Sequence, residues 1–428
     1  MNRLKPSQPK KISSRSALAA GASGNLIEWY DFYAYAAFSL YFADAFFPNA
    51  DPLAQMLSTS GVFALGFLMR PIGALIFGRI GDRAGRGRAL TFSVLLMCSG
   101  SLLIALTPDY AAIGIAAPST LLLARMLQGL SLGGEYGSSA VYLAEIAPKD
   151  SRGFYSSFQT VTMLTGQLLA LGLLIILQNF FLDASELKNW GWRIPFAIGA
   201  GLASAVFWLR RGLAEPEAFK QAAKDSQQGT LRLLLHHKRE AATVIGLTLG
   251  GTIAFYTYTT YMQKFLKLST GFSHKETSWI LAGSLIFAII LQPLYGALSD
   301  HIGRRPMLIA FGVLGALVTW PLLNAIQKTT NPIEAFILIC CGWLIISFYT
   351  SINAIVKAEL FPTTIRVTGV ALPYALTVSL FGGSAEYVAL SFKTHGHESW
   401  FYIYVSLAIA ISLCVFVAMT DTKEKTLE

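Results

Sequence analysis

Five charged residues stand inside long apolar stretches of the chain and are its first candidates for chemistry. Glu28 and Asp31 are three residues apart, so one face of a helix carries both, and Arg70, Arg125 and Glu135 lie in later apolar stretches. A guanidinium binds carboxylates through paired hydrogen bonds, and a carboxylate can exchange a proton. We therefore predict that Arg70 and Arg125 bind an anionic solute, and that Glu28, Asp31 and Glu135 couple its binding to proton exchange. A structural network in which these charges neutralise one another is the alternative.

The composition indicates which elements must position these residues. Hydrophobic residues make up 54% of the 428 residues, charged residues make up 13%, and the mean hydropathy is +0.52. Soluble domains carry about 25% charged residues, so this balance is typical of a chain that lies in a lipid bilayer. A lone charge at mid-membrane costs roughly 2.5–3.5 kcal/mol, and the five charges are therefore expected to face a partner or a water-filled cavity.

Twelve apolar segments are long enough to cross a bilayer, which takes about 20 residues of helix. The first six lie near residues 18–44, 56–80, 88–108, 118–147, 153–181 and 193–212. The second six lie near residues 241–266, 276–299, 306–326, 333–360, 366–392 and 399–420. We expect an all-α integral membrane protein in which twelve transmembrane helices form two pseudo-symmetric six-helix bundles.

A short charged loop occurs once in each half of the chain. It reads GRIGDRAGRGR from Gly78 to Arg88 and GALSDHIGRR from Gly296 to Arg305, each time between the second and third apolar segments of its half. A phosphate-binding loop would need a preceding strand, and both loops instead follow a long apolar segment. The repeated plan predicts an amino-terminal tail (1–17), a first bundle (18–212), a linker (213–240), a second bundle (241–420) and a carboxy-terminal tail (421–428).

Basic residues set the predicted orientation. The net charge is +9, and most Lys and Arg residues lie in the two tails, the linker and the two repeated loops. Cytoplasmic segments of membrane proteins carry such an excess of positive charge. Both termini are therefore expected in the cytoplasm, and no cleavable signal pattern precedes the first apolar segment.

Residue types that serve other kinds of chemistry are scattered. His236, His237, His395 and His397 have no companion set of metal ligands, and the four cysteines lie in apolar stretches without metal-binding or disulfide spacing. No Ser-His-Asp or Cys-His arrangement is readable. We expect neither an enzyme nor a bound metal, and no nucleic-acid partner, because the basic residues lie between apolar segments.

The two repeated loops resemble the signature loop of the major facilitator superfamily. Within that superfamily, four motifs resemble the metabolite:proton symporter family, and the likeness extends from about residue 18 to the last apolar segment. The motifs are GNLIEWYDFYAY (Gly24–Tyr35), FLMRPIG (Phe67–Gly73), RMLQGLSLGGEYG (Arg125–Gly137) and WGWRIPF (Trp190–Phe196).

This resemblance implies a symporter in the inner membrane of a bacterium that imports a dicarboxylate, with 2-oxoglutarate (alpha-ketoglutarate) as the first choice, by alternating access. The proton gradient would drive uptake without a cofactor. The alternative cargo within the family is citrate, shikimate or a zwitterionic osmolyte, and a transporter-like nutrient sensor is a more distant alternative. The expected partners are the small organic acid, protons and lipid. The sequence does not set the oligomeric state, and a monomer is sufficient for this function.

Four further polar residues within the apolar segments are predicted to contact the substrate: Lys264, Gln159, Tyr256 and Tyr261. Lys264 is near the outer end of its segment, where a lysine that extends to the membrane surface is the alternative. The tyrosines are also typical of anchors at the membrane interface. Glu386 is one more acid inside an apolar segment, and no role is assigned to it.

The resemblance also implies a cytoplasmic gate in which charges of each repeated loop hold the two halves together. Loop residues of the first half would pair with the second half and the reverse, and a carboxylate at the place of Asp82 can meet a helix amino terminus. Glu145 and Glu359 are the predicted acidic partners. The full set is Asp82, Arg83, Arg86, Arg88, Glu145, Asp300, Arg304, Arg305 and Glu359. A charged turn without a gating role is the alternative.

Overall fold

The structure, a computed structural model, describes residues 14–84, 86–133, 135–210, 234–363 and 365–423. For residues 14–24, 78–79, 81–91, 135, 138, 203 and 205–210 it describes the backbone alone. Each of the twelve predicted apolar segments coincides with one helix or with consecutive helices. Helix ends differ from the predicted ends by only a few residues, because the apolar stretches end where polar loops begin.

The first half of the chain forms nine helices in the described residues. They are α1 (Ser14–Phe46), α2 (Pro52–Ala84), α3 (Arg86–Leu106), α4 (Tyr110–Ile113), α5 (Ala116–Leu132), α6 (Glu135–Ile146), α7 (Arg152–Ile176), α8 (Ala184–Asn189) and α9 (Ile194–Arg210). The 3₁₀ turns η1 (Lys149–Ser151) and η3 (Gly191–Arg193) precede α7 and α9, and the π-helical turn η2 (Leu177–Phe181) extends α7.

The second half repeats this plan. Its helices are α12 (Lys238–Tyr256), α13 (Met262–Leu268), α14 (His274–Ile302), α15 (Arg304–Lys328), α16 (Pro332–Thr350), α17 (Asn353–Leu360), α18 (Arg366–Thr377), α19 (Ala385–Thr394) and α20 (Glu398–Ala418). The 3₁₀ turn η4 (Leu235–His237) precedes α12, and the π-helical turns η5 (Thr257–Tyr261) and η6 (Val378–Gly382) join α12 to α13 and α18 to α19.

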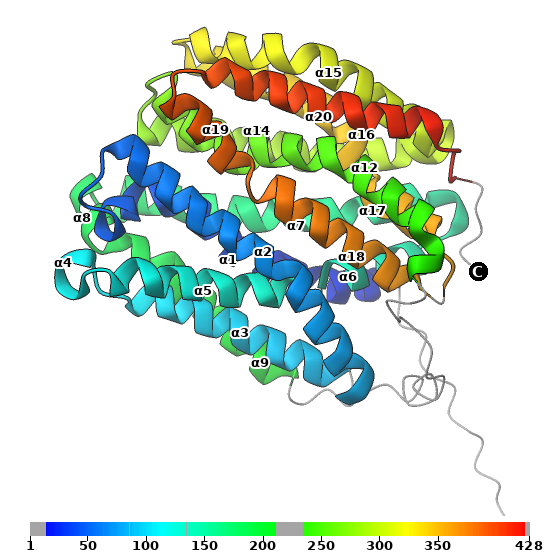
Figure 1. The fold of residues 1–428 in the computed structure, drawn as a ribbon, viewed down its shortest axis with the longest axis horizontal. Coiled ribbons are helices and arrows are strands. Elements are labelled where there is room, and N and C mark those ends of the chain that lie inside the picture. Colours follow the sequence, from blue (N-terminus) through cyan, green and yellow to red (C-terminus); the bar gives the residue numbers. More distant parts are fainter. Residues whose placement is uncertain (1–13, 85, 134, 211–233, 364, 424–428) are drawn as a thin grey trace, which may run out of the picture.

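The helices lie side by side in one bundle, with α3, α5 and α9 on one side, α15 and α20 on the opposite side, and α1, α7 and α18 between them (Figure 1). The two halves meet where α7 packs against α14 and where α2 packs against α18, η6 and α19. We call the end that carries Asp300 and the start of α7 the loop end, and the end that carries α4 and α8 the far end.

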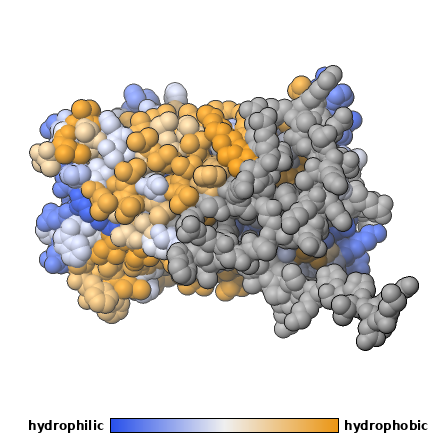
Figure 2. Space-filling view, turned by 90° about the horizontal axis from the view of Figure 1, so that it is seen from below, coloured by the Kyte–Doolittle hydropathy of each residue, from blue (hydrophilic) through white to orange (hydrophobic). Residues whose placement is uncertain are grey.

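Large apolar side chains cover the outside of the bundle. Leu65, Leu68, Ile72 and Ile76 of α2 are each more than two-fifths exposed, and Leu317 of α15 is 70% exposed. Where its residues are not drawn in grey, Figure 2 shows apolar residues over the middle of one face and polar residues at its left end. Within the part of the chain that the structure describes, eight helices or helix runs have the length and hydropathy needed to cross a membrane. This surface suits contact with lipid, in which such exposure carries no penalty.

Small residues let the helices that carry the two arginines approach closely. A side-chain carbon at Gly129 of α5 would lie 1.9 Å from the Gly66 carbonyl oxygen of α2. One at Gly133 would lie 2.1 Å from the carbonyl oxygen of Arg70. Close backbone approach at small residues is a main source of helix association in membranes. The glycines around Arg70 and Arg125 therefore fix the separation of α2 and α5.

Candidate functional site

A small cavity lies between the two halves. The first half contributes residues of α6 and α7, and the second half contributes residues of α12, α16, α17 and α18. The cavity is lined by Tyr136, Thr160, Met163, Gly251, Thr252, Phe255, Tyr256, Tyr349, Thr350, Asn353 and Tyr374. Part of its wall is the break between α16 and α17, and interrupted helices of this kind occur in membranes where they border a binding site.

Contacts between the halves occur on both sides of this cavity. Toward the loop end, the hydroxyl of Tyr136 donates to Asn353 Oδ1 at 2.8 Å, and its ring stacks on Tyr374 with centroids 3.6 Å apart. Toward the far end, the hydroxyl of Tyr33 donates to the Thr259 carbonyl at 2.8 Å, and Gln263 donates to the Ala37 carbonyl at 3.1 Å. The structure therefore holds the cavity between two layers of contacts.

Arg70 lies beside the cavity on α2. Its guanidinium carbon is 4.0 Å from the centroid of the Phe67 ring and 4.8 Å from that of Phe32. The side chain is only 5% exposed, it forms no ion pair among the described residues, and its Nε and Nη2 atoms have no hydrogen-bond partner. The Phe67 ring that Arg70 contacts packs against Tyr256 of the cavity wall, with ring centroids 5.3 Å apart. A buried cation with unused donors at a cavity is suited to an anionic ligand.

Arg125 and Asp31 form a connected network one layer behind the cavity. Arg125 Nη1 donates to Gln128 Oε1 at 2.7 Å, and Gln128 Nε2 donates to Asp31 Oδ2 at 2.6 Å. Ser101 donates to the other Asp31 oxygen at 2.5 Å. All four side chains are fully buried or nearly so. The structure thus brings together a predicted cation and a predicted acid, through a glutamine that the sequence analysis did not single out.

Two of the predicted acids have less defined surroundings. Glu28 is buried, at 8% exposed, on the same helix as Asp31. Glu135 begins α6, and its side chain lies outside the described residues. Their roles in proton coupling stay predictions.

Lys264 does not extend to the membrane surface. Its Nζ atom is 2.8 Å from Glu386 Oε1, and both side chains are at most 3% exposed. The predicted alternative of a surface lysine is therefore wrong, because an acid of α19 packs against α13 inside the second half. This contact also gives Glu386 a partner that spacing along the chain did not reveal.

The other predicted polar ligands separate in space. Tyr256 lines the cavity, and Thr160, rather than its neighbour Gln159, faces the cavity from α7. Gln159 donates to Ser139 at 3.0 Å within the first half. Tyr261 donates to Glu398 at 3.1 Å. Consecutive helix positions are about 100° apart, so a sequence without a known helix rotation does not show which of two neighbours faces inward.

Lys357 is a buried cation that the sequence analysis did not single out, because it lies near the end of the predicted apolar segment 333–360, where basic residues are common. It is 0% exposed on α17, and its Nζ atom is 3.0 Å from Asn353 Oδ1. Its spacing from Asn353, one helical turn in an otherwise apolar stretch, was the available signal.

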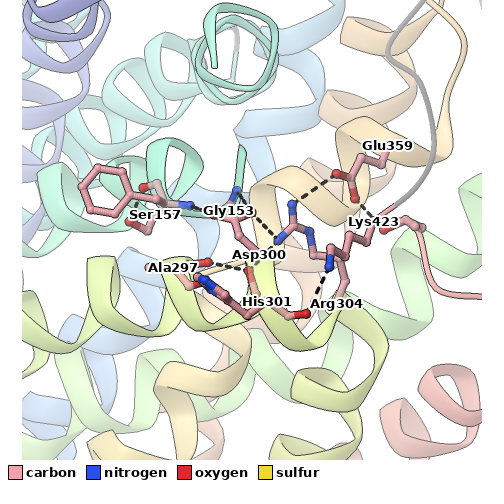
Figure 3. A network of polar contacts seen from close by, with 12 residues as sticks. Gly153, Ser157, Ala297, Asp300, His301, Arg304, Glu359 and Lys423 are labelled. Carbon is pink, nitrogen blue, oxygen red and sulfur yellow. Dashed lines mark hydrogen bonds and ion pairs between the residues drawn. The ribbon is translucent and has the colours of Figure 1, made fainter. Parts of the chain in front are cut away.

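The gate is best defined around Asp300, at the loop end of α14 (Figure 3). Its carboxylate accepts hydrogen bonds from the backbone N–H groups of Gly153 and Phe154, at 2.8 and 2.9 Å, in the first turn of α7. A carboxylate at a helix amino terminus satisfies free N–H groups and interacts favourably with the helix dipole. Asp300 therefore ties the second half to the first, which is the contact proposed for its counterpart Asp82.

The arginines at the start of α15 are also predicted gate residues. Arg304 pairs with Asp300 at 2.8 Å and with Glu359 at 3.6 Å, and all three belong to the second half. Arg305 donates to the backbone carbonyls of Phe416 and Val417, also in the second half. Among the described side chains, both arginines contact groups of the second half, and their pairing with first-half charges stays a prediction. Arg304 holds Asp300 in place.

Glu145 does join the two halves. Its carboxylate, on α6, is 2.7 Å from Arg366 Nη1 at the start of α18. Arg366 is fully buried, whereas the Glu145 side chain is 42% exposed. The predicted gate residues Asp82, Arg83, Arg86 and Arg88 have side chains that lie outside the described residues, and their pairing stays a prediction.

Replacing Asp300 with asparagine is expected to loosen the loop end. The variant keeps one oxygen acceptor but loses the charge that faces the α7 dipole and Arg304, which contributes roughly 1–2 kcal/mol. Spin labels at exposed Lys149 and Arg239, in a background without the four cysteines, should then show a larger share of long distances. Asp150→Asn, an exposed acid at the same end, is the matched control. An unchanged distance distribution in Asp300→Asn would contradict this role.

Comparison with known proteins places this geometry in a family. The family model described as "Sugar (and other) transporter" matches residues 17–219, and the model "Major Facilitator Superfamily" matches residues 252–427. The chain is 50% identical to the alpha-ketoglutarate permease of Escherichia coli (strain K12) over 399 residues, which covers 93% of this chain and 92% of that protein. The chain belongs to the major facilitator superfamily, in its metabolite:proton symporter family.

Two further relatives show the breadth of this family. A citrate-proton symporter of Salmonella typhi is 33% identical and covers 94% of each chain. A proline/betaine transporter of Salmonella typhimurium is 31% identical, over 97% of this chain and 85% of that one. A solved structure of the xylose transporter XylE from E. coli, partially occluded and inward open, superposes with a TM-score of 0.74 at 18% identity, over 97% and 99% of the two chains. The predicted twelve-helix fold is confirmed, and the chain is a membrane transporter rather than an enzyme.

Proposed function

We propose that this chain imports a dicarboxylate, with 2-oxoglutarate as the first choice, together with protons across a bacterial inner membrane. The observation that carries the proposal is Arg70, a buried guanidinium with unused donors beside a cavity between the two halves. The 50% identity to an alpha-ketoglutarate permease supports the choice of cargo. Guanidinium groups suit carboxylates through bidentate hydrogen bonds.

Asp31 is the proposed proton carrier, with Glu28 and Glu135 as the other candidates. Arg70 and Arg125 both lie against the Phe32 ring, with guanidinium carbons 4.8 and 4.3 Å from its centroid. An anion bound at Arg70 offsets part of the positive potential that favours ionised Asp31, and so favours proton uptake there. Arg125 then influences the protonation of Asp31 through Gln128, which bonds to both side chains, in addition to its predicted role in binding the substrate.

Transport would proceed as the two halves rock around the cavity. The loop end, held by Asp300 and by the Glu145–Arg366 pair, would open toward the cytoplasm, where both termini lie. The far end would open by release of the contacts between Tyr33 and Thr259 and between Gln263 and Ala37. In this scheme the bundles comprise residues 18–212 and 241–420, joined by the linker 213–240.

Uptake of labelled 2-oxoglutarate into vesicles tests this function directly. An imposed inward proton gradient should accelerate uptake, and a protonophore should abolish the acceleration. Unlabelled succinate, citrate, shikimate and betaine are each tested as competitors, because relatives of this chain include citrate and betaine transporters. We expect dicarboxylates to compete and betaine not to compete. Uptake that a protonophore does not change would exclude proton symport. Competition by betaine but by none of the organic acids would show that the substrate is an osmolyte and not a dicarboxylate.

A further inference from the structure

Three lysines in the second half are buried or partly buried, and they differ in one respect. Lys264 is paired with Glu386 at 2.8 Å, and Lys393 is paired with Glu398 at 2.9 Å. Lys357 is 0% exposed and has no acidic partner within ion-pair distance among the residues that the structure describes. The fold thus supplies a carboxylate to buried Lys264 and to partly buried Lys393, and it leaves buried Lys357 for another anion.

The polar and aromatic contacts of Lys357 with described residues are all neutral, and all of them border the cavity. Its Nζ atom is 3.0 Å from Asn353 Oδ1, 3.5 Å from the Tyr136 hydroxyl and 4.1 Å from the centroid of the Tyr374 ring. Asn353, Tyr136 and Tyr374 all line the cavity. An ammonium carries three N–H donors, so these two hydrogen-bond acceptors leave one donor for a ligand. Burial of a charge without a counter-ion is costly, and a bound anion removes that cost.

We propose that Lys357 binds the second carboxylate of the substrate, and that it makes the cavity select dianions over monoanions and zwitterions. This inference rests on the proposed function and specifies the site that it uses. Arg70 lies against Phe67, whose ring packs on the cavity residue Tyr256 with centroids 5.3 Å apart, and Lys357 lies against Tyr374 of the cavity wall. A ligand with a carboxylate at each end therefore joins the two halves. A zwitterion would instead place its cationic group near one of the two cations.

The test compares Lys357→Gln with wild type in proteoliposomes. Inhibition constants are measured for the best dicarboxylate of the competition panel and for 2-oxopentanoate, which has the five-carbon chain of 2-oxoglutarate but one carboxylate. Loss of one charge-assisted hydrogen bond should weaken dicarboxylate binding about 10- to 100-fold, with less than about a threefold change for 2-oxopentanoate. Lys357→Arg should retain the preference, and Lys328→Gln, at an exposed position, is the matched control.

A second variant does not depend on how well Lys357→Gln folds. Asn353→Asp places a carboxylate at the position of the acceptor 3.0 Å from Lys357 Nζ, so the lysine acquires an internal counter-ion. This variant should raise the thermal stability of the purified protein and still lose dicarboxylate affinity by a similar factor. An unchanged ratio of the two inhibition constants in both variants would overturn the role of Lys357. If the wild-type protein binds another dicarboxylate of the panel more tightly than 2-oxoglutarate, only the proposed substrate changes. If it binds no dicarboxylate, both proposals are overturned.

Discussion

Arg70→Lys is expected to reduce the affinity for 2-oxoglutarate by roughly 10- to 100-fold while the protein still inserts and folds. The guanidinium of Arg70 lies against the rings of Phe67 and Phe32, with its carbon 4.0 and 4.8 Å from their centroids. A lysine ammonium keeps the charge but neither stacks in this way nor presents two parallel donors to one carboxylate. The loss corresponds to about 1.5–3 kcal/mol of charge-assisted hydrogen bonding. The affinity is measured from the dependence of proton-driven uptake on 2-oxoglutarate concentration in proteoliposomes.

Arg193→Lys provides the matched control. Arg193 also lies against an aromatic ring, that of Trp192 at 4.1 Å, and pairs with Asp109 at 2.6 Å, but it is at the far end of the bundle and outside the cavity. We expect nearly normal uptake from this variant. Normal substrate affinity in Arg70→Lys, with equal amounts of protein in the membrane, would remove Arg70 from the binding site.

Lys264→Met is expected to lower the free energy of unfolding by about 3–5 kcal/mol. The change leaves Glu386, which is 2% exposed, as a buried acid without its ion-pair partner 2.8 Å away. The double variant Lys264→Met/Glu386→Gln removes both charges, and it should recover most of the lost stability because no uncompensated charge remains. Thermal unfolding of the detergent-solubilised protein, followed by size-exclusion profile, compares the three proteins.

Uptake by the same double variant decides between two roles of Lys264. If the pair only holds α13 against α19, the double variant transports 2-oxoglutarate with near-normal affinity. If Lys264 binds substrate, as the sequence analysis predicted, affinity falls even though stability recovers. A Lys264→Met protein as stable as wild type would contradict the structural role of the pair.

Much of the fold follows from one-dimensional features of the chain. The bilayer requires about 20 apolar residues for each span, so the ends of α14 and α20 fall close to the ends of their apolar stretches. The breaks and π-helical turns inside the spans could not be predicted from these features. The break before Asn353 and the π-helical turn at Thr257–Tyr261 contain neither glycine nor proline, and packing against neighbouring helices decides them.

The sequence predicted several residues of the candidate site, but it did not predict which of them contact one another. Arg70 and Arg125 were identified because a charged residue inside an apolar span is costly and therefore indicates a partner or a cavity. Lys357 was not, because a lysine close to the end of a span is usually taken as a cytoplasmic charge, and only burial against Tyr374 distinguishes it. Asp300 was expected at the gate, and the helix that it caps could not be named, since Gly153 lies far from it in sequence.

The sequence by itself determined the membrane environment, the two-fold plan, the family and the buried arginines Arg70 and Arg125, because each depends on residue types and their order along the chain. The tertiary structure alone decided which charge meets which: Arg125 with Asp31 through Gln128, Lys264 with Glu386, and Lys357 with no acid in the described part. The physical reason is that such pairing depends on the rotation of each helix about its axis. That rotation is set by small residues such as Gly129, where two backbones touch.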